Sequence, residues 1–194
     1  IQATRDVDRS DVAALSLSTQ GASSLLVDKA FNTLTNAITW MDGRASEEKS
    51  IILERLGEDY VYKKTGWRTH PALDACKLLW FNNHRKDIYA KSAYFVSTLE
   101  YMNYRLTGVV ATDPTNCAIR QLMDIKSLEY DDLILEVVGG DKNKLPKILP
   151  TGEFLGNLTQ QSASDLGLTE AVKVYNGAHD QYCGLYGANI VNDG

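Results

Sequence analysis

Asp180, near the end of the chain, is placed where its carboxylate could act as a general base, and the polar residue Gln181 follows it. The alternating apolar residues Val172 and Val174 before them predict a short strand. Gly177 is expected to give a sharp turn, after which the apolar spacing becomes helical. Asp180 would then lie at a helix N-terminus, where free N–H groups and the helix dipole favour a carboxylate. The segment predicts either a reactive group beyond the strand ends or simply a helix cap.

The segments that must position these residues alternate between predicted strands and predicted helices. Apolar runs predict strands over 12–18, 24–28, 34–39, 93–96 and 109–112 and from Val172. Capping residues and apolar stripes predict helices over 46–56, 58–64, 97–107, 131–138 and 159–167 and from Pro71. The strand over 12–18 is expected to be buried and to form a hairpin or a sharp corner with the next. This alternation predicts an α/β domain in which helices cover a sheet.

Composition limits the classes of function. The 194 residues suffice for one sizeable domain, and a hydrophobic content of 44% supports a packed core. A net charge of −5 argues against a nucleic-acid partner, which needs a basic surface. No apolar run reaches the ~18 residues of a membrane span, and no signal-peptide pattern opens the sequence, so we expect no membrane partner.

Cysteine and histidine residues do not suggest a metal site. Cys76, Cys117 and Cys183 lie far apart and are odd in number. Each has apolar neighbours at helical spacing, so we expect buried, reduced thiols and a cytoplasmic location. The three histidines lack the spacing of zinc ligands, so no protein-built metal site is expected.

Seven short motifs occur in a fixed order along the chain. They are Ser-Thr-Gln at 18–20, Ala-Ile-Thr-Trp-Met-Asp-Gly-Arg at 37–44, Lys-Leu-Leu-Trp-Phe at 77–81, Tyr-Arg-Leu-Thr-Gly at 104–108, Thr-Asp-Pro-Thr-Asn-Cys-Ala at 112–118, Gly152 with Gly156, and Gly-Ala-His-Asp-Gln at 177–181. In this order they resemble the N-terminal domain of the FGGY carbohydrate kinases, the family of glycerol kinase, xylulokinase and gluconate kinase. The resemblance implies a ribonuclease-H-like α/β domain of the actin and hexokinase superfamily. In whole family members this domain packs against a second one, and sugar and ATP meet between them.

The resemblance also implies roles for particular residues. Asp180 matches the family's catalytic base. Substrate-binding positions fall at Gln20, Gly21, Ala22, Trp40 and Gln181. The indole of Trp40 would cover the polyol, although a core tryptophan is the alternative. Asp42 and Arg44 are expected to pair and hold the turn behind it, and Lys77 is expected to be scaffold.

Two departures from the family pattern shape the prediction. No Asp-x-Gly-Thr-Thr/Ser phosphate loop occurs in the sequence. We therefore expect residues 1–194 to be a partial N-terminal, sugar-binding domain, incomplete at its N-terminus, with the ATP-binding C-terminal domain absent. ATP and Mg²⁺ would bind only in the full-length enzyme, and this fragment alone would be inactive. Second, Gly21 and Ala22 replace the Arg-Glu of glycerol kinases and the Met-His of xylulokinases, which leaves room for a bulkier or more oxidised acceptor.

Three functions are compatible with these observations. The first is the substrate-binding domain of an ATP-dependent sugar or polyol kinase, a phosphotransferase of carbohydrate metabolism. The second is a non-catalytic sugar-binding or regulatory module of the same fold. The third, a hydrolase using Asp180 with His179, is disfavoured because adjacent side chains on a turn should diverge and no Ser or Cys nucleophile motif is present. A homodimer is possible, since dimers are the commonest assemblies.

Overall fold

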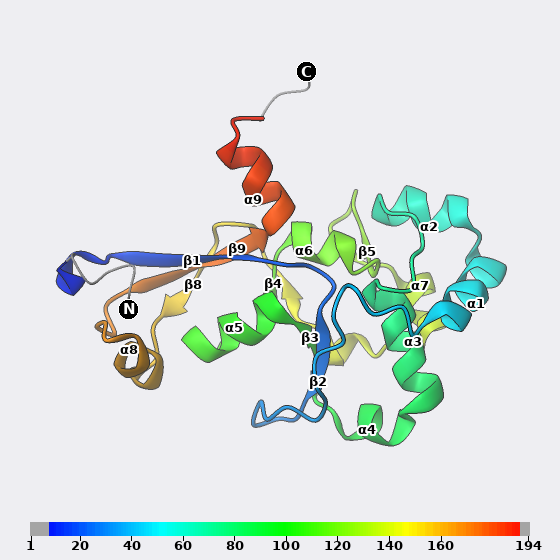
Figure 1. The fold of residues 1–194 in the computed structure, drawn as a ribbon, viewed down its shortest axis with the longest axis horizontal. Coiled ribbons are helices and arrows are strands. Elements are labelled where there is room, and N and C mark those ends of the chain that lie inside the picture. The colour runs from blue at the N-terminus through cyan, green and yellow to red at the C-terminus, as the bar shows by residue number, and fades with distance from the viewer. Residues whose placement is uncertain (1–7, 191–194) are drawn as a thin grey trace.

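A three-stranded sheet carries the segment that ends at Asp180. In the computed structural model, which describes residues 8–190, β1 (Ala14–Thr19) runs parallel to β9 (Lys173–His179) (Figure 1). The strand β8 (Phe154–Asn157) pairs with the other side of β9 in the antiparallel sense. Thr19 lies opposite His179, so both parallel strands end at the same edge of the sheet. The residues that follow them are therefore neighbours in space.

Shorter strand pairs continue the fold on the other side of a sharp corner. The chain leaves β1 and turns into β2 (Ser24–Val27), which pairs with β3 (Tyr94–Ser97) rather than with β1. The predicted corner is thus confirmed and the hairpin is wrong. The remaining pairs are β4 (Ala111–Thr112) with β7 (Lys147–Ile148), and β5 (Met123–Asp124) with β6 (Glu129–Tyr130).

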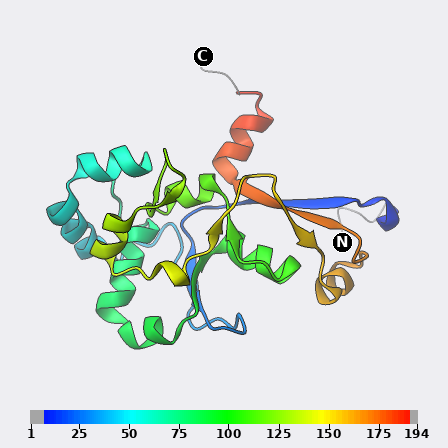
Figure 2. The same cartoon turned by 180° about the vertical axis from the view of Figure 1, so that it is seen from behind.

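Helices fill the space around these strands. They are α1 (Ser46–Leu56), α2 (Glu58–Thr65), α3 (Asp74–His84), α4 (Lys86–Lys91), α5 (Thr98–Thr107), α6 (Pro114–Ile119), α7 (Asp132–Val138), α8 (Gln160–Leu166), α9 (Asp180–Gly187) and the short 3₁₀ helices η1 (Arg9–Asp11) and η2 (Lys142–Lys144). Helices α1, α3 and α7 contact one another over the largest core cluster, which includes Ile52, Leu78 and Ile134. Figures 1 and 2 show α9 projecting away from the sheet.

Several predicted boundaries need correction. No strand forms over 34–39: within this segment a single isolated bridge, between Ile38 and Ser24, joins it to β2, and a second bridge, between Thr33 and Val27, lies just before it. The helix expected from Pro71 begins at Asp74, since Leu73 is extended. Strand β1 is not buried: its residues alternate between exposed and half-exposed, because it lies at the edge of its sheet.

Gly177 does not form a turn. It lies within β9, and a Cβ built on it would come 2.0 Å from the carbonyl oxygen of Leu17. The glycine is needed because two backbones approach closely here, beside an irregularity in the β1–β9 register between Ser16 and Ser18. The chain then passes directly from strand to helix at His179 and Asp180.

Buried polar side chains join the separate strand pairs. The side-chain amide of Asn176, on β9, donates to the carbonyl oxygens of Thr112 and Leu149, both 3.0 Å away. The buried guanidinium of Arg120 donates to the carboxylate of Asp74 (2.7 Å) and lies 3.4 Å from that of Glu100. Asn176 thus joins β9 to β4 and to the segment after β7, and it accepts the side-chain amide of Asn103 on α5 at 3.0 Å. Arg120 joins α3 to α5, and removing one partner of such a buried ion pair is costly.

The cysteines follow the prediction in part. Cys76 and Cys117 are buried and free, and burial raises the pKa of both thiols to about 12. Cys183 is only half-buried, because α9 projects from the domain. Within residues 8–190, no helical segment has the length and hydropathy that crossing a bilayer requires.

Candidate active site

A cavity of about 1070 Å³ opens where β1 and β9 end. The six predicted site residues all line it: Gln20, Gly21, Ala22, Trp40, Asp180 and Gln181. They come together because the parallel strands bring positions 20 and 180 to one edge, and the corner after β1 turns the chain toward Trp40. The carboxylate of Asp180 therefore shares a cavity with the indole of Trp40.

Asp180 is the first residue of α9, and about half of its side chain is exposed. The Nε2 atom of His179 lies 3.3 Å from Oδ1 of Asp180. The expectation that these adjacent side chains diverge is therefore wrong. Burial lowers the pKa of His179, which favours the neutral imidazole at neutral pH, and its Nδ1 has no hydrogen-bond partner among the described residues. A neutral ring can donate through Nε2–H toward the carboxylate.

Gly21 and Ala22 form the floor of the cavity. A Cβ at Gly21 would lie 2.6 Å from Cγ2 of Ile119 and 2.9 Å from Nε2 of His179. Ala22 is buried and has a positive φ of 52°. The small residue at position 21 therefore makes room for the side chains of Ile119 and His179, which already occupy the space above it.

Trp40 stands at the rim with 53% of its surface exposed, so the alternative of a core tryptophan is wrong. Its backbone N–H donates to the hydroxyl of Ser23 at 3.3 Å. The same hydroxyl accepts a bond from the side-chain amide of Gln20 at 3.1 Å. Ser23 thus connects Gln20 to Trp40, a link for which the sequence carried no signal.

Lys77 supports the same part of the cavity from beneath. Its buried ammonium donates to the carbonyl oxygens of Ala22 (2.5 Å), Ile38 (3.2 Å) and Thr39 (3.0 Å). Burial lowers the pKa of Lys77. The ammonium group of Lys77 therefore connects the backbone at Ala22 to the segment that precedes Trp40, and its predicted scaffold role is confirmed.

The turn after Trp40 is held as predicted. The guanidinium of Arg44 donates to both carboxylate oxygens of Asp42, at 3.0 and 2.7 Å, and lies 5.0 Å from the ring centre of Trp80. This pair lowers the pKa of Asp42 through the side-chain hydrogen bond from Arg44. Behind the site, Asp113 caps α6 and accepts from Thr115, whose hydroxyl accepts the N–H of His179 at 2.9 Å.

One wall of the cavity was not predicted from the sequence. Trp67, Arg68 and His70 line it, from the segment between α2 and α3. None belongs to a motif, and a loop of mixed composition gives no periodicity from which to predict a wall.

The side chains of residues 8–190 do not by themselves fit a nucleotide phosphate site with a divalent metal ion. Within residues 8–190, no group of three or more His, Cys, Asp or Glu side chains is arranged to hold a metal ion. The sequence also contains no Asp-x-Gly-Thr-Thr/Ser segment.

Comparison with known proteins gives a consistent result. A family model described as the FGGY family of carbohydrate kinases, N-terminal domain, matches residues 1–187. The chain is 30% identical over 189 residues to a xylulose kinase of Bacillus subtilis (strain 168), covering 97% of this chain and 38% of that protein. It is 28% identical to a gluconokinase of the same strain, covering 94% of this chain and 36% of that one. The chain thus spans less than two fifths of these relatives' length.

Solved structures agree in fold. The ligand-bound xylulose kinase of Lactobacillus acidophilus superimposes with a TM-score of 0.90 at 30% identity, over 97% of this chain and 38% of that one. The glycerol kinase of Plasmodium falciparum with ADP gives a TM-score of 0.85 at 23% identity, over 93% of this chain and 37% of that one. The expected ribonuclease-H-like fold of the actin and hexokinase superfamily is confirmed.

Proposed function

Since the chain belongs to the FGGY family of carbohydrate kinases, we propose that it binds the acceptor in a kinase that phosphorylates a hydroxyl of a sugar or polyol. The observation that supports this most directly is the shared cavity of Asp180 and Trp40. A carboxylate beside an exposed indole provides both a proton acceptor and an apolar face for a carbohydrate.

Asp180 is the general base of this proposal. Phosphoryl transfer to an alcohol passes through a loose transition state, so the acceptor oxygen needs positioning and late removal of its proton. A carboxylate within hydrogen-bond reach of that hydroxyl suffices, and such help is typically worth ~10²–10⁴-fold in rate. The side chain of Asp180 lines the cavity and is about half exposed, so it can contact a ligand there, while Nε2 of His179 lies 3.3 Å from its carboxylate.

The other cavity residues bind and orient the acceptor. The indole of Trp40 packs on the C–H face of the carbohydrate, and the amides of Gln20 and Gln181 take its hydroxyls. Gly21 and Ala22 contribute only backbone and small apolar surface, so specificity is supplied by the surrounding walls.

Binding of the phosphoryl donor, ATP, would require the whole protein. We propose that residues 1–194 are part of the N-terminal domain and that ATP and Mg²⁺ bind with the help of a second domain outside this chain. On this view the 194 residues alone do not phosphorylate a substrate. The opposing candidate is a sugar-binding or regulatory module of the same fold without catalysis.

The test replaces Asp180 with Asn in the full-length protein. We expect kcat to fall by about 10²–10⁴-fold, with little change in acceptor affinity or thermal midpoint. The matched control is Asp87→Asn, since Asp87 also lies exposed in the first turn of a helix, α4, away from the cavity, and this variant should keep wild-type activity. More than a tenth of wild-type kcat in Asp180→Asn would reject the base role. A wild-type protein that binds sugars but phosphorylates none would favour the non-catalytic module.

A further inference from the structure

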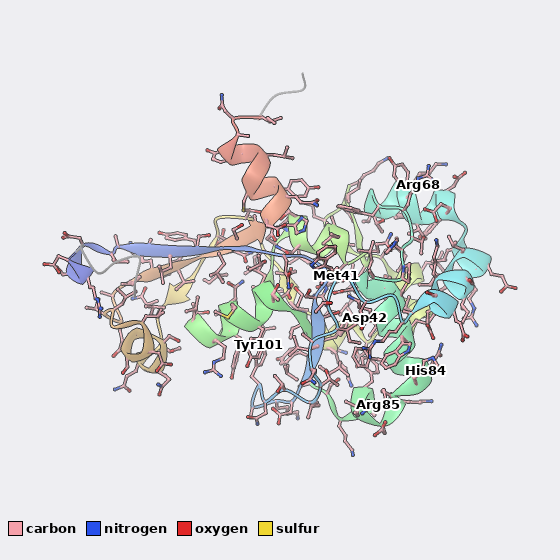
Figure 3. The ribbon with its side chains drawn as sticks, in the orientation of Figure 1. Met41, Asp42, Arg68, His84, Arg85 and Tyr101 are labelled. Atoms are coloured by element: carbon pink, nitrogen blue, oxygen red, sulfur yellow. The ribbon has the colours of Figure 1, made fainter. Side chains whose placement is uncertain are left out.

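The part of the cavity wall between α2 and α3, called the donor wall below, presents the hydrogen-bond donors of Arg68 and His70. Arg68 and His70 are both exposed and both line the cavity that holds Asp180. Figure 3 shows Arg68 beside α2, on the part of the domain away from α9. A guanidinium has five N–H donors and no acceptor, whereas a carboxylate only accepts. The cavity is therefore lined by a carboxylate acceptor from α9 and by the N–H donors of Arg68 and His70 from the segment between α2 and α3.

The positive charge of Arg68 is not neutralised within the described part of the chain. The ion pairs among residues 8–190 do not include Arg68, and its guanidinium carbon lies 5.9 Å from the ring centre of Tyr62. The carboxylate of Glu58 accepts the backbone N–H of Thr69, the residue after Arg68, at 2.9 Å. Arg68 is therefore available to an anion from outside the chain.

His70 adds a second hydrogen-bond donor, because its backbone contact defines the tautomer of the neutral imidazole ring. Its Nδ1 accepts the backbone N–H of Ala72 at 3.2 Å, so in the neutral ring the proton is on Nε2. The Nε2–H group has no hydrogen-bond partner among the described residues, and the side chain lines the cavity. Arg68 and His70 together offer the fork of donors that a planar carboxylate or a phosphate accepts.

Arg68 is the only lysine or arginine among the described residues that line the cavity, and the donors of Gln20, Gln181 and the histidines belong to side chains without a fixed positive charge. Gly21 and Ala22 bring no polar side chain, and Trp40 and Trp67 supply apolar faces. A volume of about 1070 Å³ holds a six-carbon chain lying between Asp180 and the donor wall. An elongated acceptor would then place a hydroxyl at Asp180 and its other end at Arg68.

We propose that the acceptor is an anionic sugar, whose carboxylate or phosphate group binds Arg68 and His70 while a hydroxyl faces Asp180. This inference rests on the proposed kinase function and names its substrate class. An aldonate and a sugar phosphate share the required chemistry. Neutral sugars and polyols lack the group that the donor wall selects.

The experiment compares matched acceptors with the full-length protein. Each aldonate of four to six carbons is tested against the alditol of the same stereochemistry and against the corresponding alditol phosphate, with kcat/KM measured in an ATP-coupled assay. We expect the acid or the phosphate to exceed the alditol by about 10–100-fold, which corresponds to one charge-assisted contact. The two anionic arms distinguish carboxylate from phosphate.

Variants then assign the preference to Arg68. Arg68→Gln should lower kcat/KM for the anionic acceptor by about 10–100-fold and leave the alditol unchanged, and Arg68→Lys should retain part of the preference. Arg55→Gln, at an exposed position on α1, is the charge-matched control and should have no effect. Preference for alditols, or an equal loss for acids and alditols in Arg68→Gln, would overturn the anionic acceptor while the kinase proposal stands. Failure to phosphorylate any member of the panel would overturn both.

Discussion

Replacing Gly177 with Ala tests the strand contact that positions Asp180. The new Cβ would lie 2.0 Å from the carbonyl oxygen of Leu17, whereas ordinary contact begins at 3.4 Å. The obstacle is backbone, so β1 and β9 must separate by more than an ångström, which strains the hydrogen bonds of the ladder. Overpacking of this kind costs about 1–3 kcal/mol, and each weakened bond adds about 1 kcal/mol, so we expect a loss of about 3–5 kcal/mol.

Gly184 provides the control within the same segment. It lies in α9, where an added Cβ would meet no atom within 4 Å, and Ala there should stabilise the helix by about 0.5–1 kcal/mol. In thermal melts followed by circular dichroism, the midpoint of this domain should fall by about 6–20 °C for Gly177→Ala, at 2–4 °C per kcal/mol. It should not fall for Gly184→Ala. A Gly177→Ala midpoint within about 2 °C of wild type would refute the close approach of the two strands.

Two further predictions concern the groups that support the site. In Lys77→Met, the carbonyl oxygen of Ala22 loses its hydrogen-bond donor, so we expect a stability loss of about 1–3 kcal/mol. The KM for the acceptor should rise with a smaller change in kcat. A fall in kcat alone would contradict the positioning role of Lys77. Because burial lowers the folded pKa of His179 below 6.5, its neutral form stabilises the fold fully above that pH and this contribution is lost as pH falls below it. Denaturant melts at pH 7 and pH 5 should therefore show the stability difference between wild type and His179→Asn shrinking on acidification, and a constant difference would count against it.

Local signals predicted the ends of many elements correctly. Gly57, Gly108 and Gly167 end helices at positive φ, where a residue without a side chain is favoured. Thr159 and Asp131 accept backbone N–H groups at the starts of α8 and α7. These features depend on a few consecutive residues, so a single sequence contains the information needed to predict them.

Errors arose where distant segments meet. Apolar spacing suggested a strand over 34–39, but on the edge of β2 away from β3 this segment forms only one isolated bridge, between Ile38 and Ser24. The role of Gly177 depends on Leu17, some 160 positions earlier, and no local pattern marks such a contact. The scaffold role of Lys77 was predicted, but its burial and its carbonyl partners were not, since lysine is rarely buried and these partners come from two other segments.

The order of strands explains why the candidate site could be assembled from sequence only through family resemblance. Asp180 reaches the cavity because β9, the last strand described, lies parallel to β1, the first. Closing a loop of this length is entropically costly, so the pairing depends on the packing of the intervening segments rather than on local preference. Asn176 supplies part of that packing by bonding β9 to β4 and to the segment after β7. The proposed base is therefore placed only when the whole domain is folded, so the position of Asp180 depends on contacts far from it.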